Sequence, residues 1–245
     1  MPSSAFTLFN KKACDVEDII KLFRDINARP GPNTNYSLLN GALILLVSSW
    51  EVYCEDVVRQ AAHKIYEKPN LAFNDLPQST RRELITYAHK SYKGNQDPLD
   101  ENLALLPDNG WKRLMVNRLG EYIHDFNTPK FRRTKGKNLV ELFRHVLSVT
   151  ISHEICTLLG EKDFCQKLDN IITLRGEIAH TGDAAQENKL NADTLSNYTN
   201  AFREAAAAID VIIHREFREN YGFAPWQITK PIRSRLRKTA VAKLN

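Results

Sequence analysis

An arginine and a histidine, Arg175 and His180, are separated by four residues near the end of an apolar helical pattern. Arginine offers fixed donors to phosphate oxygens, and histidine gives or takes a proton near pH 7. These two groups suffice for metal-free chemistry on a phosphodiester. We therefore take residues 175–180 as the leading candidate for a ribonuclease site.

The spacing alone does not select this pair, because two similar pairs occur elsewhere in the chain. Arg118 is followed by His124, and Arg82 is followed by His89. Pairs at such spacings are expected by chance in a chain of this composition, so the surroundings must distinguish them. Arg118 and Arg82 are predicted to lie on the outer faces of ordinary helices.

Arg175 has a different context. On a helix with 100° per residue it lies within about 20° of Phe164 and Leu168, at the centre of an apolar stripe. A guanidinium there is costly unless it is paired or lies in a functional cleft. His180 is about 140° away on a straight helix, so a shared face requires distortion at Gly176 or an end to the helix. The alternative is an internal ion pair beside a helix-terminal histidine.

Two acidic residues are candidates to support this site. Glu51 lies in an apolar stripe of a long predicted helix, where an unpaired carboxylate is costly. We expect it to pair with Arg175 or to orient His180, and the open alternative is a position at the edge of a dimer interface. Asp183, three residues after His180, is a second candidate for orienting the imidazole.

Basic residues are concentrated in two segments. Residues 230–245 carry six Lys or Arg and no acid, so the net charge of +5 falls to −1 when they are removed. Residues 130–137 form a second basic cluster. Short blocks of this kind often contact nucleic acid, and a solvated tail that only aids solubility is the alternative. The candidate RNA contacts are Arg132, Arg133, Lys135, Lys137, Arg233, Arg235 and Arg237.

The composition is that of a folded protein without a metal or cofactor site. With 245 residues and 42% hydrophobic content the chain can bury a large core. No signal peptide, membrane span, phosphate loop or zinc motif is predicted. The cysteines show no CxxC pairing, so reduced thiols in a cytoplasmic protein are expected. They are Cys14, Cys54, Cys156 and Cys165.

Helical periodicity dominates and strand-like alternation is nearly absent, which predicts an all-α helical bundle with an interrupted middle section. Residues 36–66 carry apolar side chains over a wide surface, so they should form its long central helix. We expect one helical domain over residues 1–222, an insertion-like segment at about 68–137, and a basic C-terminal tail at 223–245. The other predicted helices cover residues 15–28, 79–90, 111–126, 138–149, 161–179 and 191–221.

Three pieces of the chain together resemble the HEPN superfamily, and in particular its RiboL-PSP-HEPN group. They are residues 39–53, 138–144 and 171–180, in family-like order within a resemblance over about residues 15–220. The resemblance implies a helical bundle that dimerises, so that two Arg-x4-6-His motifs share one cleft. Arg175 and His180 match that motif, whereas Gly176 stands where the family often has a polar residue.

The resemblance also implies a function. Many members are metal-independent endoribonucleases of toxin–antitoxin, anti-phage defence or RNA-processing systems, and others are non-catalytic. We therefore expect a cytoplasmic homodimer, without cofactor or membrane association, that cleaves RNA and has an antitoxin or defence partner. The alternatives are a non-catalytic HEPN-like module that binds RNA or protein, and a purely structural dimer.

Overall fold

The computed structural model describes residues 1–28, 36–90, 106, 109–126, 128–132, 138–181, 190–233 and 236. Within these residues all regular elements are helices and no strand occurs, which confirms the predicted all-α bundle. The elements are α1 (Ser4–Asn27), α2 (Tyr36–Tyr66), η1 (Phe73–Asp75), α3 (Gln78–Lys90), α5 (Gly110–His124), α6 (Leu139–Leu147), α7 (Ser152–Leu159), α8 (Phe164–Thr181), α9 (Ala192–Tyr221) and α10 (Lys230–Arg233).

Helix α1 begins eleven residues before the start predicted at residue 15. Ser3 caps it, because its side chain accepts a hydrogen bond of 3.0 Å from the backbone N–H of Phe6. The buried side chains of Phe6, Phe9 and Ala13 continue the apolar stripe of the later turns. The polar side chain of the exposed Lys11 obscures this continuation in the sequence.

Helix α2 is the long central helix, and its bounds match the prediction. It contacts α1, α5, α6, α8 and α9, which explains why apolar side chains surround most of its circumference. Trp50 is fully buried, and its Nε1–H donates to the carbonyl oxygen of Pro129 at 3.3 Å. By length and composition α2 is a weak candidate membrane span. Its contacts with five other helices are those of a core helix of the bundle.

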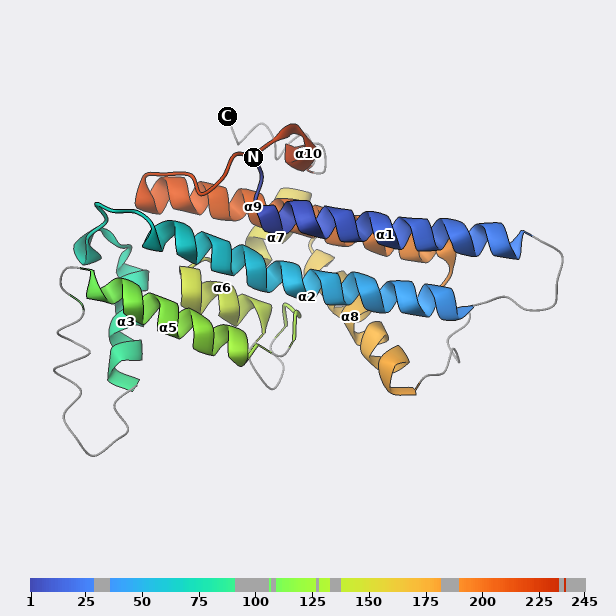
Figure 1. Ribbon diagram of the computed structural model, residues 1–245, viewed down its shortest axis with the longest axis horizontal. Coiled ribbons are helices and arrows are strands. Elements are labelled where there is room, and N and C mark those ends of the chain that lie inside the picture. Colours follow the sequence, from blue (N-terminus) through green and yellow to red (C-terminus); the bar gives the residue numbers. More distant parts are fainter. Residues whose placement is uncertain are drawn as a thin grey trace.

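The helices are arranged around α2, as Figure 1 shows. Helices α1, α2 and α9 run side by side along the long axis of the molecule, and each contacts the other two. On the other side of α2 lie α5, α6 and α8. Helix α7 packs against α8 and α9. The bundle therefore has one long layer that supports a second layer of shorter helices.

The described part of the predicted middle insertion belongs to this second layer. Helices α3 and α5 pack against each other and against α6, and α5 also contacts α2. Trp111 at the start of α5 is fully buried, and the neighbouring Lys112 donates to the carbonyl oxygen of Lys68 at 2.8 Å. Residues 91–105, 107 and 108 of the same predicted insertion lie outside the described residues.

Packing continues past residue 222, where the tail was predicted to begin. Trp226 is buried, and its Nε1–H donates to the carbonyl oxygen of Asp210 in α9 at 3.1 Å. The backbone N–H of Gln227 donates to the carbonyl oxygen of Met1 at 3.0 Å. Ile232 in α10 is also fully buried. The segment after α9 thus joins α9 to the N-terminus, and residues 234–235 and 237–245 lie outside the described residues.

A buried carboxylate, that of Asp210, connects three parts of the long layer. Its Oδ1 accepts hydrogen bonds from the Ser3 hydroxyl at 2.9 Å and from the Tyr53 hydroxyl at 3.0 Å. Its Oδ2 accepts from the backbone N–H of Ser3 at 3.2 Å. Burial raises the pKa of Asp210 to about 7, although these hydrogen bonds lower it. Near neutral pH the carboxyl group is therefore poised between its two protonation states.

The raised pKa makes a prediction for stability. Between about pH 4 and pH 7 the folded state keeps a proton on Asp210 that the unfolded state releases, so this group's contribution to stability falls as pH rises through that window. Asn cannot titrate, so the variant Asp210→Asn lacks this pH dependence. We therefore expect the difference in the free energy of unfolding, wild type minus Asp210→Asn, to fall from pH 4 to pH 7. The decrease should be on the order of 3–4 kcal/mol, and level off above about pH 8.

Urea unfolding at a series of pH values measures this difference. The matched control is the substitution Asp25→Asn at an exposed position of α1, which should not reproduce the decrease. A difference between wild type and Asp210→Asn that is constant with pH would contradict the assignment.

Candidate functional site

Arg175 joins α8 to α2. Its guanidinium is half-buried, and its Nη2 donates to the hydroxyl of Ser48 in α2 at 3.3 Å. Its Nε is buried and has no hydrogen-bond partner among the described residues. The apolar stripe predicted around Arg175 is present, since Leu168 and Ile171 on α8 are buried. Among the described residues, Arg175 thus has a side-chain contact with α2 and an Nε–H donor without a partner.

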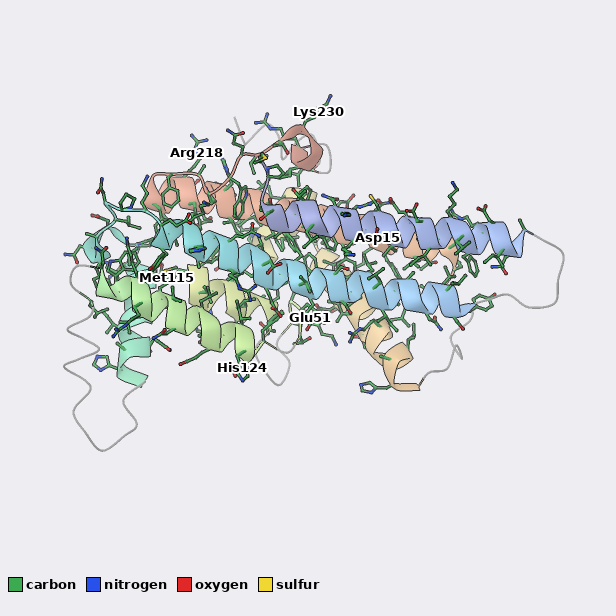
Figure 2. The ribbon with its side chains drawn as sticks, in the orientation of Figure 1. Asp15, Glu51, Met115, His124, Arg218 and Lys230 are labelled. Atoms are coloured by element: carbon green, nitrogen blue, oxygen red, sulfur yellow. The ribbon has the colours of Figure 1, made fainter. Side chains whose placement is uncertain are left out.

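Glu51 lies one turn after Ser48 on α2 and is half-buried. Figure 2 shows Glu51 on the side of α2 that faces away from α1. Burial raises the pKa of Glu51, and the positive charge of Arg175 partly offsets this by lowering it. The two groups are thus within electrostatic reach, although no direct ion pair between them occurs among the described residues. We refer to Ser48, Glu51 and Arg175 as the Arg175 cluster.

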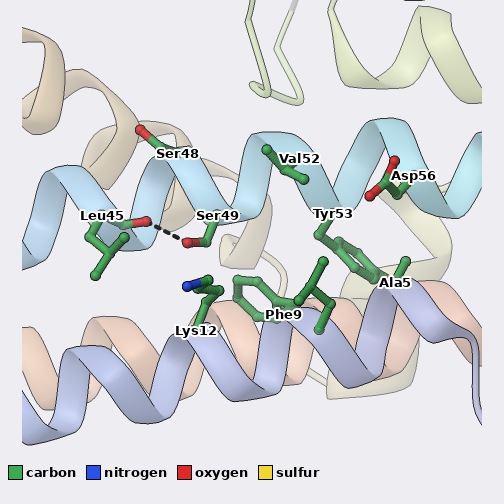
Figure 3. A pocket seen from close by; sticks show the side chains of 10 residues that line it. Ala5, Phe9, Lys12, Leu45, Ser48, Ser49, Val52, Tyr53 and Asp56 are labelled. Carbon is green, nitrogen blue, oxygen red and sulfur yellow. Dashed lines mark hydrogen bonds between the residues drawn. The ribbon is translucent and has the colours of Figure 1, made fainter.

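A cavity of about 190 Å³ lies between α1 and α2 next to this cluster. Figure 3 shows the Ser48 side chain directed away from α1, whereas Ser49 is directed towards α1 and donates to the carbonyl oxygen of Leu45 at 2.7 Å. The cavity is smaller than the range of about 300–1,000 Å³ for small-molecule sites. Ser48 therefore serves the contact with Arg175 rather than the cavity.

His180 lies in the last turn of α8 and is exposed. The helix runs without interruption through Gly176 to residue 181, so the distortion or earlier helix end considered from the sequence does not occur. On such a helix His180 is directed about 140° away from Arg175. Figure 1 shows the last turns of α8 diverging from α2. One chain therefore does not bring the two side chains together.

The face of α8 that carries His180 also holds the basic segment at residues 128–132. Asp169 and Thr173 lie eleven and seven residues before His180, within about 20° of its direction on the helix. Asp169 accepts hydrogen bonds from the backbone N–H groups of Phe131 at 2.7 Å and Arg132 at 2.9 Å. The Nζ of Lys130 donates to the hydroxyl of Thr173 at 2.9 Å. Two cationic residues thus lie on the same side of α8 as His180.

Sequence reasoning missed Asp169 and Ser48. The signal for Asp169 was an acid directly after Leu168 and before the apolar Ile171, and its side chain is only 5% exposed. Burial raises the pKa of Asp169, and the two backbone N–H donors lower it. Ser48 gave no comparable signal, because small polar residues occur on many helices without a functional role.

Other predicted site residues are placed differently. Arg132 is exposed beside α8, and Arg233 is exposed at the end of α10. Figure 1 shows α10 on the opposite side of the long layer from the end of α8, so Arg233 is not brought to the Arg175 cluster. The remaining candidates lie outside the described residues. They are Asp183, Arg133, Lys135, Lys137, Arg235 and Arg237.

The prediction that Arg118 lies on an outer helix face was wrong. Arg118 is 3% exposed, and its Nη2 forms an ion pair of 2.5 Å with Glu83 of α3. Glu83 also binds the Nδ1 of His145 at 3.0 Å. Arg118 therefore joins α5 to α3, and Glu83 extends the link to α6, whereas Arg82 and His89 are exposed. Arg118 is thus more deeply buried than the half-buried Arg175, so burial alone does not single out Arg175.

Two features of the site bear on its chemistry. Among the described residues, no group of three or more His, Cys, Asp or Glu side chains is arranged to hold a metal ion. The groups available are a guanidinium with a fixed position, an exposed imidazole and nearby lysine and arginine side chains. Such groups bind phosphate and transfer protons.

A comparison with protein-family models matches residues 13–215 to the family described as RiboL-PSP-HEPN. The matched region covers most of the chain and includes both α2 and α8. The chain belongs to the RiboL-PSP-HEPN family. The resemblance seen in the sequence is thus confirmed, and membership of this HEPN family points to an RNA-related function. A search of curated proteins found no match, and a search of solved structures found none either.

The anchoring of residues 128–132 makes a second prediction. In Asp169→Asn one oxygen becomes an NH₂ group that cannot accept from a backbone N–H, so a buried donor is left without a partner. We expect faster hydrogen exchange at the amides of Phe131 and Arg132, and a loss of roughly 1–3 kcal/mol in unfolding free energy. Hydrogen exchange followed by mass spectrometry or NMR measures the first effect. The substitution Asp163→Asn at an exposed position before α8 is the control, and equal exchange in both variants would refute the anchor.

Proposed function

We propose that this HEPN protein is a metal-independent endoribonuclease in which two copies of the chain share one site built from Arg175 and His180. The observation that carries the proposal is the divergence of these two side chains on one regular helix. Arg175 is turned to α2, and His180 is exposed about 140° away. Because a single chain leaves the pair apart, a second copy would have to complete the site.

A shared site also meets a chemical requirement. Attack by a 2′-hydroxyl on the adjacent phosphate needs a base to remove the hydroxyl proton and an acid to protonate the leaving 5′-oxygen. A two-fold axis would supply two copies of His180 for these two roles. The products would be a 2′,3′-cyclic phosphate and a 5′-hydroxyl end.

Arg175 would stabilise the negative charge that develops on the phosphate. Its contact with Ser48 supports this role, because a guanidinium with a fixed position loses less freedom when it binds an oxyanion. Glu51, whose pKa is affected by the charge of Arg175, would hold the guanidinium in place without neutralising it in a direct pair. Asp183 keeps its proposed role of orienting the imidazole.

RNA would reach this site along the basic side of α8. Lys130 and Arg132 are held on the face that carries His180, where they would contact the phosphates on either side of the cleaved bond. We propose the same role for Arg133, Lys135 and Lys137, and a more distant contact for Arg233, Arg235 and Arg237. The setting that we propose is a toxin–antitoxin or anti-phage defence system in the cytoplasm, with an antitoxin or defence partner.

A second candidate function is a non-catalytic HEPN module that binds RNA or a protein. Gly176 favours it, because a polar side chain is often found at this position in the family. A Cβ at Gly176 would meet no atom within 4 Å, so packing does not explain the glycine. The missing polar group would remove a contact to substrate or water while leaving the binding surface intact.

The catalytic proposal predicts cleavage of single-stranded RNA in EDTA. His180→Ala should lower the rate by about 10²–10⁴-fold, the usual contribution of a general acid or base. Arg175→Lys should also reduce cleavage, because lysine does not reproduce the planar guanidinium fork. A matched control is the exposed pair on α3, since Arg82→Ala and His89→Ala should leave the rate unchanged.

Gel analysis of a labelled RNA, with mapping of the 2′,3′-cyclic phosphate, measures these rates and products. Circular dichroism checks that each variant is folded. Full activity of His180→Ala, or a requirement for added Mg²⁺, would rule out the mechanism. Salt-sensitive RNA binding without any product would favour the non-catalytic module.

A shared site makes a further prediction about mixtures. If each site needs both copies of His180, a tenfold excess of inactive His180→Ala should suppress wild-type cleavage by sequestering wild-type chains in mixed dimers. The same excess of His89→Ala should not suppress it. Sedimentation of the wild type at micromolar concentration checks the oligomeric state. A monomer that cleaves at full rate would disprove the shared site.

A further inference from the structure

Two cysteines face each other where α7 meets α8. The Sγ atoms of Cys156 in α7 and Cys165 in α8 are 3.6 Å apart, and both side chains are partly exposed. The Cys165 thiol also donates to the carbonyl oxygen of Ser152 at 3.5 Å. The two thiols therefore already lie in contact in the reduced protein.

The backbone holds this contact in place. Helix α7 ends at Leu159 and is capped by Gly160, which adopts a left-handed conformation with φ of 65°, and this conformation favours glycine. The carbonyl oxygen of Cys156 accepts from the backbone N–H groups of Gly160 and Glu161. The chain then turns back into α8, so that Cys165 is brought beside Cys156. The sulfur atoms would need to approach by only about 1.5 Å to reach the bonding distance of about 2.05 Å.

The other two cysteines provide a contrast. Cys54 in α2 is fully buried. Cys14 is exposed, and its sulfur lies 3.3 Å from the Nη2 of Arg203. Since all four cysteines belong to the described residues, their mutual contacts can be compared directly. The pair of Cys156 and Cys165 is the one with two thiols in contact.

We propose that Cys156 and Cys165 are a redox modification site, at which a peroxide converts the two thiols into a reversible disulfide across the α7–α8 corner. The Cys156 sulfur attacks hydrogen peroxide, the O–O bond breaks, and a sulfenic acid and one water form. The Cys165 sulfur then attacks the sulfenic sulfur, the S–O bond breaks, and a second water leaves with the thiol proton. Two thiols are oxidised and one peroxide is reduced to two waters.

The environment assigns an order to the two sulfurs. Burial and the neighbouring Cys156 raise the pKa of Cys165 above its usual value, so Cys165 keeps its proton and is the second to react. The disulfide would tie the first turn of α8 to α7. Arg175 and His180 lie ten and fifteen residues farther along the same helix, so the bond would fix the base of the helix that carries them. This inference does not depend on ribonuclease activity.

The test uses the full chain with Cys14→Ser, which removes the exposed thiol. After treatment with hydrogen peroxide, the thiol titre should fall by two per chain and return after dithiothreitol. Mass spectrometry of a non-reduced digest should show a peptide that contains Cys156 joined to Cys165. Replacing either residue with Ser should abolish the cross-link, and Cys54→Ser should leave it unchanged.

Several results would overturn the proposal. One is a thiol titre that does not change under conditions that oxidise Cys14 in the wild type. Another is Cys156 in a sulfinic state while Cys165 remains free. A third is a cross-link that forms equally well with Cys54 or between two chains, because it would not depend on the α7–α8 corner. Circular dichroism of the Ser variants ensures that a lost cross-link is not lost folding.

Discussion

The position of α2 in the bundle depends on a polar contact inside the long layer. Asp210 of α9 accepts hydrogen bonds from Ser3 at the start of α1 and from Tyr53 of α2. One carboxyl group therefore sets the position of these three helices along their axes, which apolar packing alone would not fix. Apolar contacts are not directional, whereas a buried hydrogen bond must be made or its loss costs stability. A second cross-link, between the buried Arg203 and Glu17, joins α1 and α9 in the same layer.

The candidate site depends on this arrangement because α2 carries half of it. Ser48 lies five residues before Tyr53, so the helix that Asp210 fixes also carries the hydroxyl that receives Arg175. Helix α8 in turn packs on α2 and α9. The guanidinium of Arg175 is therefore held in place by the central helix α2. His180, by contrast, is exposed at the end of α8 that diverges from α2. The fold thus holds the guanidinium in place and leaves the imidazole open to solvent.

Much of this fold followed from residue patterns, and the reasons for the failures are physical. Helix α2 was predicted at its true bounds because a wide apolar surface has one simple explanation. Helix α9 was predicted at residues 191–221, and the side chain of Asn191 caps it by accepting from the backbone N–H of Thr194. The first turns of α1 were missed because lysines interrupt a stripe that only the three-dimensional packing makes continuous. Arg118 was misjudged because its partner, Glu83, is distant in sequence. The relation of Arg175 to His180 depended on whether Gly176 ends or distorts the helix, and a single glycine at a helix position is tolerated.

The way in which α8 holds the basic segment has a consequence for how this surface can change in evolution. Asp169 binds backbone N–H groups at residues 131 and 132, and every amino acid except proline supplies that group. The buried side chain of Phe131 packs against Trp50, whereas Arg132 binds Asp169 through its backbone N–H and its side chain is exposed. The place of the segment is therefore set by backbone atoms and by the buried Phe131. The exposed side chain at position 132 can therefore be exchanged without loss of the two backbone hydrogen bonds that hold the segment beside α8.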